Sequence, residues 1–272
     1  MAPRIFLVTG ATSGIGKHTA ALLAKTGASV LVHGRSPSRV AAAVEELKLS
    51  SGNQNIKGYI ADMSSLAEVR KLADELHATQ THIDVLINNA GVFETERLES
   101  ADGFEMTFAV NVLAPFLLTS LLLDLLKAGH KSRIINVSSI SHLDAISLDM
   151  DDLQLTNCYG NGRKAYGQSK LCEIMFNLEM ADRLKAHNIT ANCLDPGTVN
   201  TQMLLKSWGK IGIPVEKADD EFHLACDEEF ENVTGKYFVN LKQTEASHLA
   251  YKQKLREKLW DCLIKMTQAK FE

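Results

Sequence analysis

The chain has 272 residues, of which 45% are hydrophobic and 23% charged, and its formal net charge is −4. Such a composition is typical of a soluble globular protein, and its slightly acidic balance argues against a nucleic-acid partner. The five cysteines are scattered without a C-x-x-C pair, which favours free thiols over a disulfide or zinc framework.

Short hydrophobic runs alternate with longer amphipathic segments along the whole chain. Strands are expected at residues 4–9, 29–33, 56–61, 84–89, 133–138, 189–194 and 236–240. Helices are expected at residues 14–26, 38–50, 65–79, 102–127, 164–187, 215–226 and 244–268. This alternation predicts an α/β fold in one domain, with a doubly wound parallel sheet of about seven strands and helices on both faces.

No segment has the features of a signal peptide or a membrane anchor. The first residues lead directly into the first expected strand, whereas a secretory signal needs a separate hydrophobic region. The most hydrophobic stretch, residues 115–126, is too short to span a bilayer and contains Asp124. We therefore expect a cytoplasmic protein without an integral membrane segment.

A glycine-rich turn, TGATSGIG, joins the first expected strand to the first expected helix. Gly10, Gly14 and Gly16 permit a tight turn and a close approach of the backbone, so that the helix N-terminus can hold a pyrophosphate. A turn without a ligand is the alternative, but the flanking strand and helix are the context that a dinucleotide site requires.

The end of the second expected strand indicates which dinucleotide is preferred. A carboxylate at this place binds the ribose diol of NAD, whereas an arginine favours the 2′-phosphate of NADP. The sequence has Gly34 and then Arg35 here, and Ser36 and Arg39 could add contacts to a phosphate. A solvated loop charge is the alternative reading of Arg35. NADP(H) is therefore preferred over NAD(H).

Tyr166 and Lys170 are four positions apart in a helical segment, which puts them on one helix face. On spacing alone they could be an ordinary surface pair. An ammonium favours the ionised form of a phenol, whose pKa is ordinarily about 10, so we expect Lys170 and an oxidised nicotinamide to lower the pKa of Tyr166. Either Ser138 or Ser139, at the end of the fifth strand, could donate a hydrogen bond to a substrate oxygen. The serines lie in no nucleophile elbow, and the histidines have no metal-ligand spacing, so we expect neither a hydrolase nor a metal site.

These motifs resemble, in their order along the chain, those of the short-chain dehydrogenase/reductase family. The resemblance extends from TGATSGIG through Asp62, Asn88-Asn89-Ala90-Gly91, Asn111, Ser139 and the Tyr166/Lys170 pair to Pro196-Gly197. It implies a Rossmann-type fold, with a cofactor-binding part at about 1–135 and a catalytic and substrate part at about 136–272.

The resemblance also implies a role for individual residues. Ser139 matches the second-serine position of the family, and Asn111 matches an asparagine that kinks its helix and holds a water near the lysine. Asp62 taken alone would be an N-cap of the helix that begins near Ser64, but the resemblance moves it to the adenine ring. The implied catalytic residues are Asn111, Ser139, Tyr166 and Lys170. The implied cofactor-binding residues are Gly10, Thr12, Ser13, Gly14, Ile15, Gly16, Arg35, Asp62, Met63, Asn89, Ala90, Gly91, Tyr166, Lys170, Pro196, Gly197 and Thr201.

Ser139 and Tyr166 are 27 positions apart, and the segment 142–164 between them resembles an insertion of the retinol-dehydrogenase-like group. Lys170-Leu171 and Leu259-Trp260 also match that group, which implies a lipophilic carbonyl or alcohol substrate. We expect segments 140–162 and 198–214 to contact the substrate because both follow strand ends. Residues that either face the substrate or pack against the sheet are Met203, Leu204, Leu205 and Trp208.

The sequence thus predicts an NADP(H)-dependent oxidoreductase that interconverts a carbonyl group and an alcohol. A non-catalytic dinucleotide sensor or scaffold and an epimerase or dehydratase are the alternatives. The hydrophobic faces of segments 102–127 and 164–187 make a homodimer a further expectation.

Overall fold

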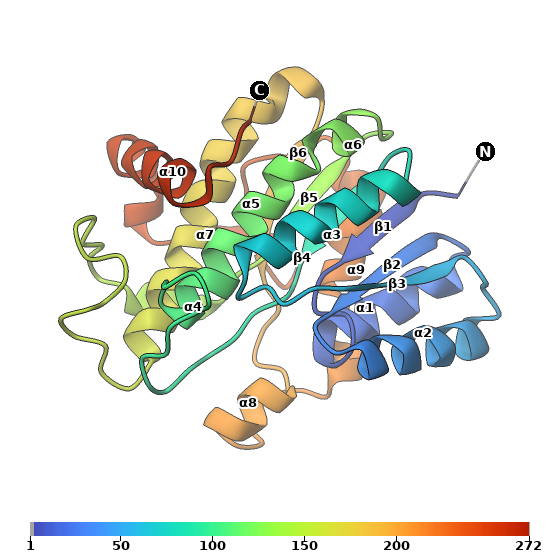
Figure 1. Ribbon diagram of the computed structural model, residues 1–272, viewed down its shortest axis with the longest axis horizontal. Coiled ribbons are helices and arrows are strands. Elements are labelled where there is room, and N and C mark those ends of the chain that lie inside the picture. Colours follow the sequence, from blue (N-terminus) through green and yellow to red (C-terminus); the bar gives the residue numbers. More distant parts are fainter. Residues whose placement is uncertain (1–2, 272) are drawn as a thin grey trace.

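Eight strands form one sheet in the computed structural model, which describes residues 3–271 (Figure 1). Their order across the sheet is β3-β2-β1-β4-β5-β6-β7-β8, and β1 to β7 pair in parallel. The strands are β1 (Ile5–Val8), β2 (Ser29–Gly34), β3 (Ile56–Ile60), β4 (Val85–Asn88), β5 (Arg133–Val137), β6 (Thr190–Asp195), β7 (Tyr237–Val239) and β8 (Lys242–Thr244). The predicted α/β fold with a parallel sheet is confirmed.

The eighth strand was not predicted from the sequence. β8 pairs antiparallel with β7, and its three residues are all exposed. An exposed edge strand lacks the hydrophobic alternation by which strands are recognised, because neither of its faces is buried.

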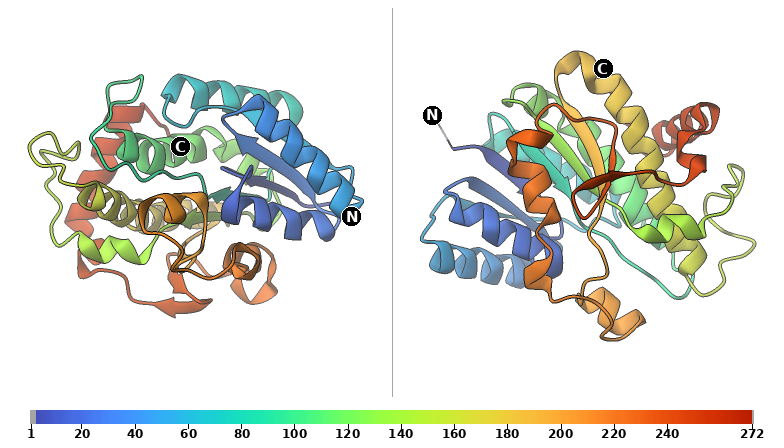
Figure 2. Two further views of the ribbon diagram at one scale, coloured as in Figure 1. Left: turned by 90° about the horizontal axis from the view of Figure 1, so that it is seen from below. Right: turned by 180° about the vertical axis from the view of Figure 1, so that it is seen from behind.

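Helices cover both faces of the sheet (Figures 1 and 2). One face carries α1 (Gly14–Lys25), α2 (Pro37–Ser51) and α9 (Asp220–Cys226), whose buried residues form one hydrophobic cluster with the sheet. The opposite face carries α3 (Leu66–Thr79), α5 (Ala114–Leu121), α7 (Arg163–Leu184) and α10 (Gln253–Thr267). The short helix α8 (Gln202–Ser207) stands apart from both layers (Figure 1).

The segment 102–127, predicted as one helix, is divided into several pieces. These are α4 (Met106–Phe108), a π-helical turn (Ala109–Leu113), α5, and α6 (Leu123–Lys127). Pro115 has no N–H for a bond to the carbonyl of Asn111 four residues earlier, so regular α-helical bonding cannot continue there. The π-turn at Asn111 follows from this missing donor.

Two other predicted helices begin later than expected. The segment 215–226 starts with a 3₁₀ turn (Val215–Lys217) before α9, and 244–268 becomes helical only at Gln253, after a 3₁₀ turn (His248–Tyr251). Among residues 3–271, no helix is both long and hydrophobic enough to cross a bilayer.

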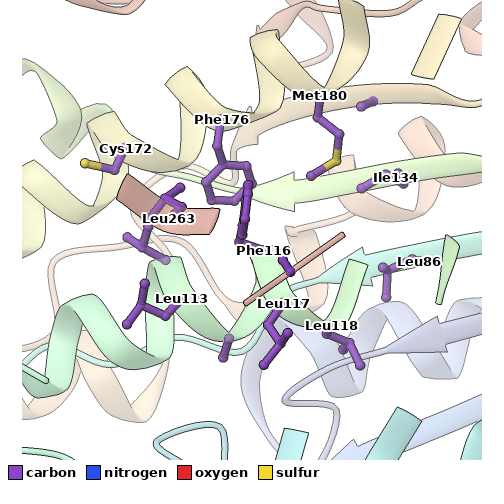
Figure 3. Packing of buried hydrophobic residues seen from close by; sticks show 14 of the residues in the cluster. Leu86, Leu113, Phe116, Leu117, Leu118, Ile134, Cys172, Phe176, Met180 and Leu263 are labelled. Carbon is purple, nitrogen blue, oxygen red and sulfur yellow. The ribbon is translucent and has the colours of Figure 1, made fainter. Parts of the chain in front are cut away.

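An aromatic cluster joins α5, α7, α10 and the end of the described chain. The Phe116 ring centroid lies 5.8 Å from that of Phe176, 4.8 Å from that of Trp260 and 5.0 Å from that of Phe271. Figure 3 shows the rings of Phe116 and Phe176 directed toward each other within this core. The hydrophobic faces on which the homodimer expectation depended are therefore covered within one chain, and they give no support to a dimer.

Candidate active site

A cleft of about 1210 Å³ lies at the edge of the sheet where β1 and β4 end. The chain turns from β1 to one side and from β4 to the other, which makes this edge the switch point of the sheet. Gly16 and Asn111 are the predicted site residues that do not line the cleft. Those that do line it are Gly10, Thr12, Ser13, Gly14, Ile15, Arg35, Asp62, Met63, Asn89, Ala90, Gly91, Ser139, Tyr166, Lys170, Pro196, Gly197 and Thr201.

The glycine turn depends on the small size of its residues. Gly10 and Gly14 have φ values of 67° and 58°, in the left-handed region that favours glycine. A Cβ on Gly16 would lie 2.2 Å from Nδ2 of Asn89, so α1 can pack against Asn89 only without a side chain here. The Asn89 amide in turn donates to the carbonyl of Thr9 at 2.7 Å. Gly16 therefore shapes the turn from behind the cleft surface.

Two residues that support this turn were not identified from the sequence as site residues. The Thr9 hydroxyl accepts hydrogen bonds from the backbone N–H groups of Asn89 and Ala90, both at 3.0 Å. Nδ1 of His33 accepts from the Gly10 N–H at 3.3 Å, and its Nε2–H donates to the Ala61 carbonyl at 3.0 Å. Burial lowers the pKa of His33 to about 4, so the ring is neutral and joins the glycine turn to β2 and to the end of β3.

The cleft end next to β2 is positively charged. Arg35 and Arg39 are exposed and line it, and neither forms an ion pair with any of residues 3–271. A Cβ on Gly34 would lie 2.5 Å from Cγ2 of Thr12 in the glycine turn. The backbone at Gly34 thus passes close to the turn, and the first side chain that can reach a ligand here is that of Arg35.

Asp62 does not cap the following helix, so the N-cap alternative is wrong. Its Oδ1 accepts from the N–H and the hydroxyl of Ser64, at 2.9 and 2.8 Å. The N-cap of α3 is Ser65, whose hydroxyl accepts from the Glu68 N–H. Asp62 and Met63 instead line the cleft beside Gly34.

Tyr166 and Lys170 lie on one face of α7 at the other end of the cleft. The Lys170 Nζ is 5.5 Å from the centroid of the Tyr166 ring and donates to the Val137 carbonyl at 2.9 Å. α7 follows Gly162, where a Cβ would lie 2.0 Å from the Glu94 carbonyl oxygen. Only glycine allows the chain to pass this close and place Tyr166 at the first helical turn.

The hydroxyl groups of the two candidate serines, Ser138 and Ser139, point in different directions. Ser138 is buried, and its hydroxyl donates to the Lys170 carbonyl at 2.9 Å. The Ser139 hydroxyl hydrogen-bonds to the Tyr166 phenol and accepts from the Ser141 N–H at 3.1 Å. Only Ser139 lies beside Tyr166 with its hydroxyl directed toward the site.

The pKa of the Tyr166 phenol differs from the prediction. Burial raises the pKa of its phenol above the ordinary value, and this effect outweighs the lowering by the Lys170 ammonium and by the bond from Ser139. The prediction of a lowered pKa is therefore wrong for the residues of the protein alone. The phenol is held in its protonated form, which is the form that can act as an acid.

Asn111 lies behind the cleft rather than in it. Its Oδ1 accepts from the Val92 N–H at 2.8 Å, and its Nδ2 donates to the Val92 carbonyl and to the Ser169 hydroxyl, both at 3.0 Å. Both N–H donors of the side-chain amide are thus used by the protein, whereas Oδ1 accepts one of the two hydrogen bonds that it can accept. A water could therefore bond to Oδ1 or to the backbone carbonyl in the π-turn.

An aromatic group beside Tyr166 defines the substrate end of the cleft. The Phe93 ring centroid lies 5.5 Å from that of Tyr166 and 4.4 Å from that of Trp208. Four residues were predicted either to face the substrate or to pack against the sheet. Three of them line the cleft, namely Met203, Leu204 and Trp208, and Leu205 does not. Phe93 was missed, because one aromatic residue after the Asn-Asn-Ala-Gly sequence has no distinguishing pattern.

The segment 140–162 contributes three residues to the cleft wall, which are Ile140, Ser141 and Asp144. Further along, this segment is hydrogen-bonded to the loop before α4, where Tyr159 donates to the Glu94 carbonyl at 2.9 Å. Most of the other hydrophobic lining comes from residues 92–110 and 198–211. A contact of the segment with the substrate stays a prediction.

No group of His, Cys, Asp or Glu side chains within residues 3–271 is arranged to hold a metal ion. The cleft suits a dinucleotide, because it is lined by the glycine turn at the N-terminus of α1, where backbone N–H groups can bind a pyrophosphate.

Comparisons with known proteins find similarity to dehydrogenases, in agreement with the motifs. A family model described as short chain dehydrogenase matches residues 4–148. Human polyprenol dehydrogenase is 37% identical over 282 residues, which cover 97% of this chain and 85% of that protein. Human retinol dehydrogenase 13 is 36% identical, with 93% of this chain and 81% of that protein covered. Among solved structures, the Pseudomonas aeruginosa RhlG/NADP active-site complex is 26% identical in sequence and has a TM-score of 0.73. The match covers 88% of this chain and 95% of the chain in that complex.

Proposed function

Because the chain belongs to the short-chain dehydrogenase/reductase family, in its retinol-dehydrogenase-like group, we propose that it is an NADP(H)-dependent enzyme that interconverts a lipophilic ketone or aldehyde and its alcohol. The observation that carries this proposal is the meeting of Ser139, Tyr166 and Lys170 at one end of a cleft whose other end is the glycine turn. A sensor or scaffold would have no need for these three groups together. We assign cofactor binding mainly to about 1–135 and catalysis to about 136–272.

The three side chains have separate tasks in this reaction. A bound nicotinamide would supply the hydride. Ser139 donates a hydrogen bond to the substrate oxygen, and Tyr166 gives its proton to that oxygen as negative charge develops on it. Lys170 has three N–H donors, of which the Val137 carbonyl takes one, so its ammonium can also bind a ribose hydroxyl. Alcohol oxidation uses the same groups in reverse, with Tyr166 as the base.

The preference for NADP(H) rests on Arg35 and Arg39. The two guanidinium groups beside the end of β2 have no ion-pair partner among the described residues and can form two-pronged contacts with a 2′-phosphate, whereas glycine at position 34 offers no carboxylate to a ribose diol. The NADP complex of the similar Pseudomonas aeruginosa protein supports the same choice.

We expect Arg35→Ala to weaken NADPH binding by about 10- to 100-fold, because a hydrogen bond to a charged group contributes about 1.5–3 kcal/mol. NADH lacks the 2′-phosphate, so its affinity should change little. Titration of the protein with each nucleotide, followed by nicotinamide fluorescence, measures both values. Arg163→Ala is the matched control, since Arg163 is an exposed arginine at the opposite end of the cleft. Equal losses for NADPH and NADH in Arg35→Ala would contradict the role of Arg35.

The lining of the cleft supports a lipophilic substrate. Phe93 and Trp208 are in tilted ring contact beside Tyr166. At the cleft wall, the exposed fractions of Leu98, Ile140 and Ile211 are 45%, 51% and 67%. Hydrophobic side chains held open to solvent next to a reactive group favour a hydrophobic ligand. The names of the similar polyprenol and retinol dehydrogenases agree with this substrate class.

The proposed function is tested by incubating the purified protein with NADPH or NADH and a panel of aldehydes, ketones, quinones and retinoids. Faster NADPH oxidation with hydrophobic members of the panel is the expected result. Nucleotide binding without turnover on any carbonyl or alcohol would favour the sensor or scaffold instead. The cytoplasmic location stays a prediction, and cell fractionation tests it.

A further inference from the structure

Glu173 is a buried carboxylate next to the reactive group, by which we mean Ser139, Tyr166 and Lys170. The proposed mechanism gives Glu173 no task. It lies three residues after Lys170 on α7, and its exposed fraction is only 2%. Its Oε2 is 2.8 Å from the Lys170 Nζ, in an ion pair whose two side chains are both almost completely buried. A carboxylate is rarely buried this deeply without a specific partner, because burial strongly disfavours its charge.

The ion pair fixes where the Lys170 ammonium lies. Nζ donates to the Val137 carbonyl at 2.9 Å and forms the ion pair with Glu173. These two contacts hold Nζ 5.5 Å from the Tyr166 ring centroid, and Nζ keeps N–H groups for a ligand. Without Glu173, a long flexible side chain would be held by a single backbone oxygen.

Few other charged or titratable groups act on this pair. Lys170 is the charge that acts on the Glu173 carboxyl, and Asp195 adds a small effect on Tyr166 from β6. Burial raises the pKa of the Cys172 and Cys193 thiols, so both are uncharged at neutral pH. The charge beside Tyr166 is therefore set mainly by Lys170 and Glu173.

We propose that Glu173 is a positioning residue of this site, which holds the Lys170 ammonium in place and whose negative charge weakens the pull of that ammonium on the Tyr166 proton. The proposal rests on the proposed function of Tyr166 and Lys170. It extends the reactive group by a fourth side chain, one helical turn below the cleft surface.

The electrostatics of the site agree with this role. Lys170 lowers the pKa of Tyr166 and Glu173 raises it, so the ionised carboxylate favours the neutral phenol. Burial raises the pKa of Glu173 itself to about 7, against the opposing effect of Lys170. Above this pH the ionised Glu173 adds to the larger effect of burial, which keeps the phenol protonated. Below it Glu173 is protonated, and the full charge of Lys170 acts on the phenol.

Glu173→Gln tests the proposal, because it keeps the size and a polar oxygen of the side chain while the negative charge is lost. We expect the phenolate of Tyr166 to form at a pH lower by about one unit or more, since one buried charge nearby has an effect of that size. Ultraviolet absorbance of the phenolate measures this midpoint, with Tyr166→Phe subtracted as the reference. The acid limb of the pH profile for alcohol oxidation should move in the same direction.

Glu221→Gln is the matched control. Glu221 is also fully buried, burial raises its pKa to about 7, and it accepts from the Thr19 hydroxyl between α1 and α9. Its substitution should leave the Tyr166 midpoint unchanged. If Glu173→Gln does not fold, Glu173→Met removes the same charge and should shift the midpoint in the same direction, with an additional loss of NADPH affinity.

An unchanged Tyr166 midpoint in a folded Glu173 variant would overturn the proposal, even if the variant were less stable. The absorbance measurement needs no substrate, so it separates this result from a failure of the proposed function. Absence of turnover in the unaltered protein would refute that function, while a shifted midpoint would still support the charge coupling.

Discussion

Tyr166→Phe is expected to lower kcat for carbonyl reduction by about 10²- to 10⁴-fold, the usual contribution of a general acid, and to leave NADPH affinity unchanged. The substitution removes one hydroxyl group and keeps the ring, whose edge contact with Phe93 at 5.5 Å remains possible. Lys170 keeps its bonds to Val137 and Glu173, so the contact proposed for the ribose is preserved. Steady-state rates with NADPH, together with nucleotide titration, separate the two effects.

Tyr159→Phe is the control for this experiment. Its hydroxyl donates to the Glu94 carbonyl at 2.9 Å, and the residue does not line the cleft. Loss of that hydroxyl should change stability slightly and leave kcat within about twofold. If Tyr166→Phe kept the rates of the unaltered protein across the carbonyl panel, another group would have to be the acid.

Phe116→Ala is expected to lower the free energy of unfolding by about 3–5 kcal/mol, because the removed ring leaves a cavity in a closely packed core. Phe116 has no exposed surface, and its ring contacts three other aromatic rings from α7, α10 and the end of the described chain. The cavity would open where these elements meet (Figure 3). Urea unfolding followed by circular dichroism measures the change.

Leu49→Ala provides the comparison on the surface. Leu49 is 81% exposed on α2, so its truncation should change the free energy of unfolding by less than about 0.5 kcal/mol. A loss below about 1 kcal/mol for Phe116→Ala would mean that the aromatic cluster can close around the missing ring.

The sequence was sufficient for the parallel sheet because most of its strands are buried and hydrophobic, and all seven predicted runs became strands, including β3 with only two buried residues. It was insufficient for β8, whose three residues are exposed, and for the π-turn at Asn111. The helical periodicity of 102–127 persists through that turn, so the pattern does not reveal the local change in bonding.

The candidate site was predicted where its residues occur at fixed spacing, as in the glycine turn and the Tyr166/Lys170 pair. Successive residues at a strand end point in opposite directions, so one of Ser138 and Ser139 had to face the site, and only the structure identifies which. Phe93 was missed because its role comes from contacts across the fold. Glu173 was missed because an acidic residue three positions after a lysine is ordinary on a helix surface, and its burial is not visible in the sequence. For the residues of the protein alone, the pKa of Tyr166 was predicted in the wrong direction, because the cost of burial is not visible in a sequence.

The buried ring of His33 has a consequence for the tolerance of the protein to acid. A histidine in an unfolded chain titrates near 6.5, whereas His33 in the fold has a pKa of about 4. Between these values the unfolded chain binds a proton that the folded protein excludes, so its stability falls as the pH drops from 6.5 toward 4. Protonation of the ring at Nδ1 would also break the hydrogen bond that Nδ1 accepts from the Gly10 N–H. Acidification should therefore loosen the glycine turn itself, and purification or storage at low pH would cost nucleotide affinity before it disrupts the rest of the sheet.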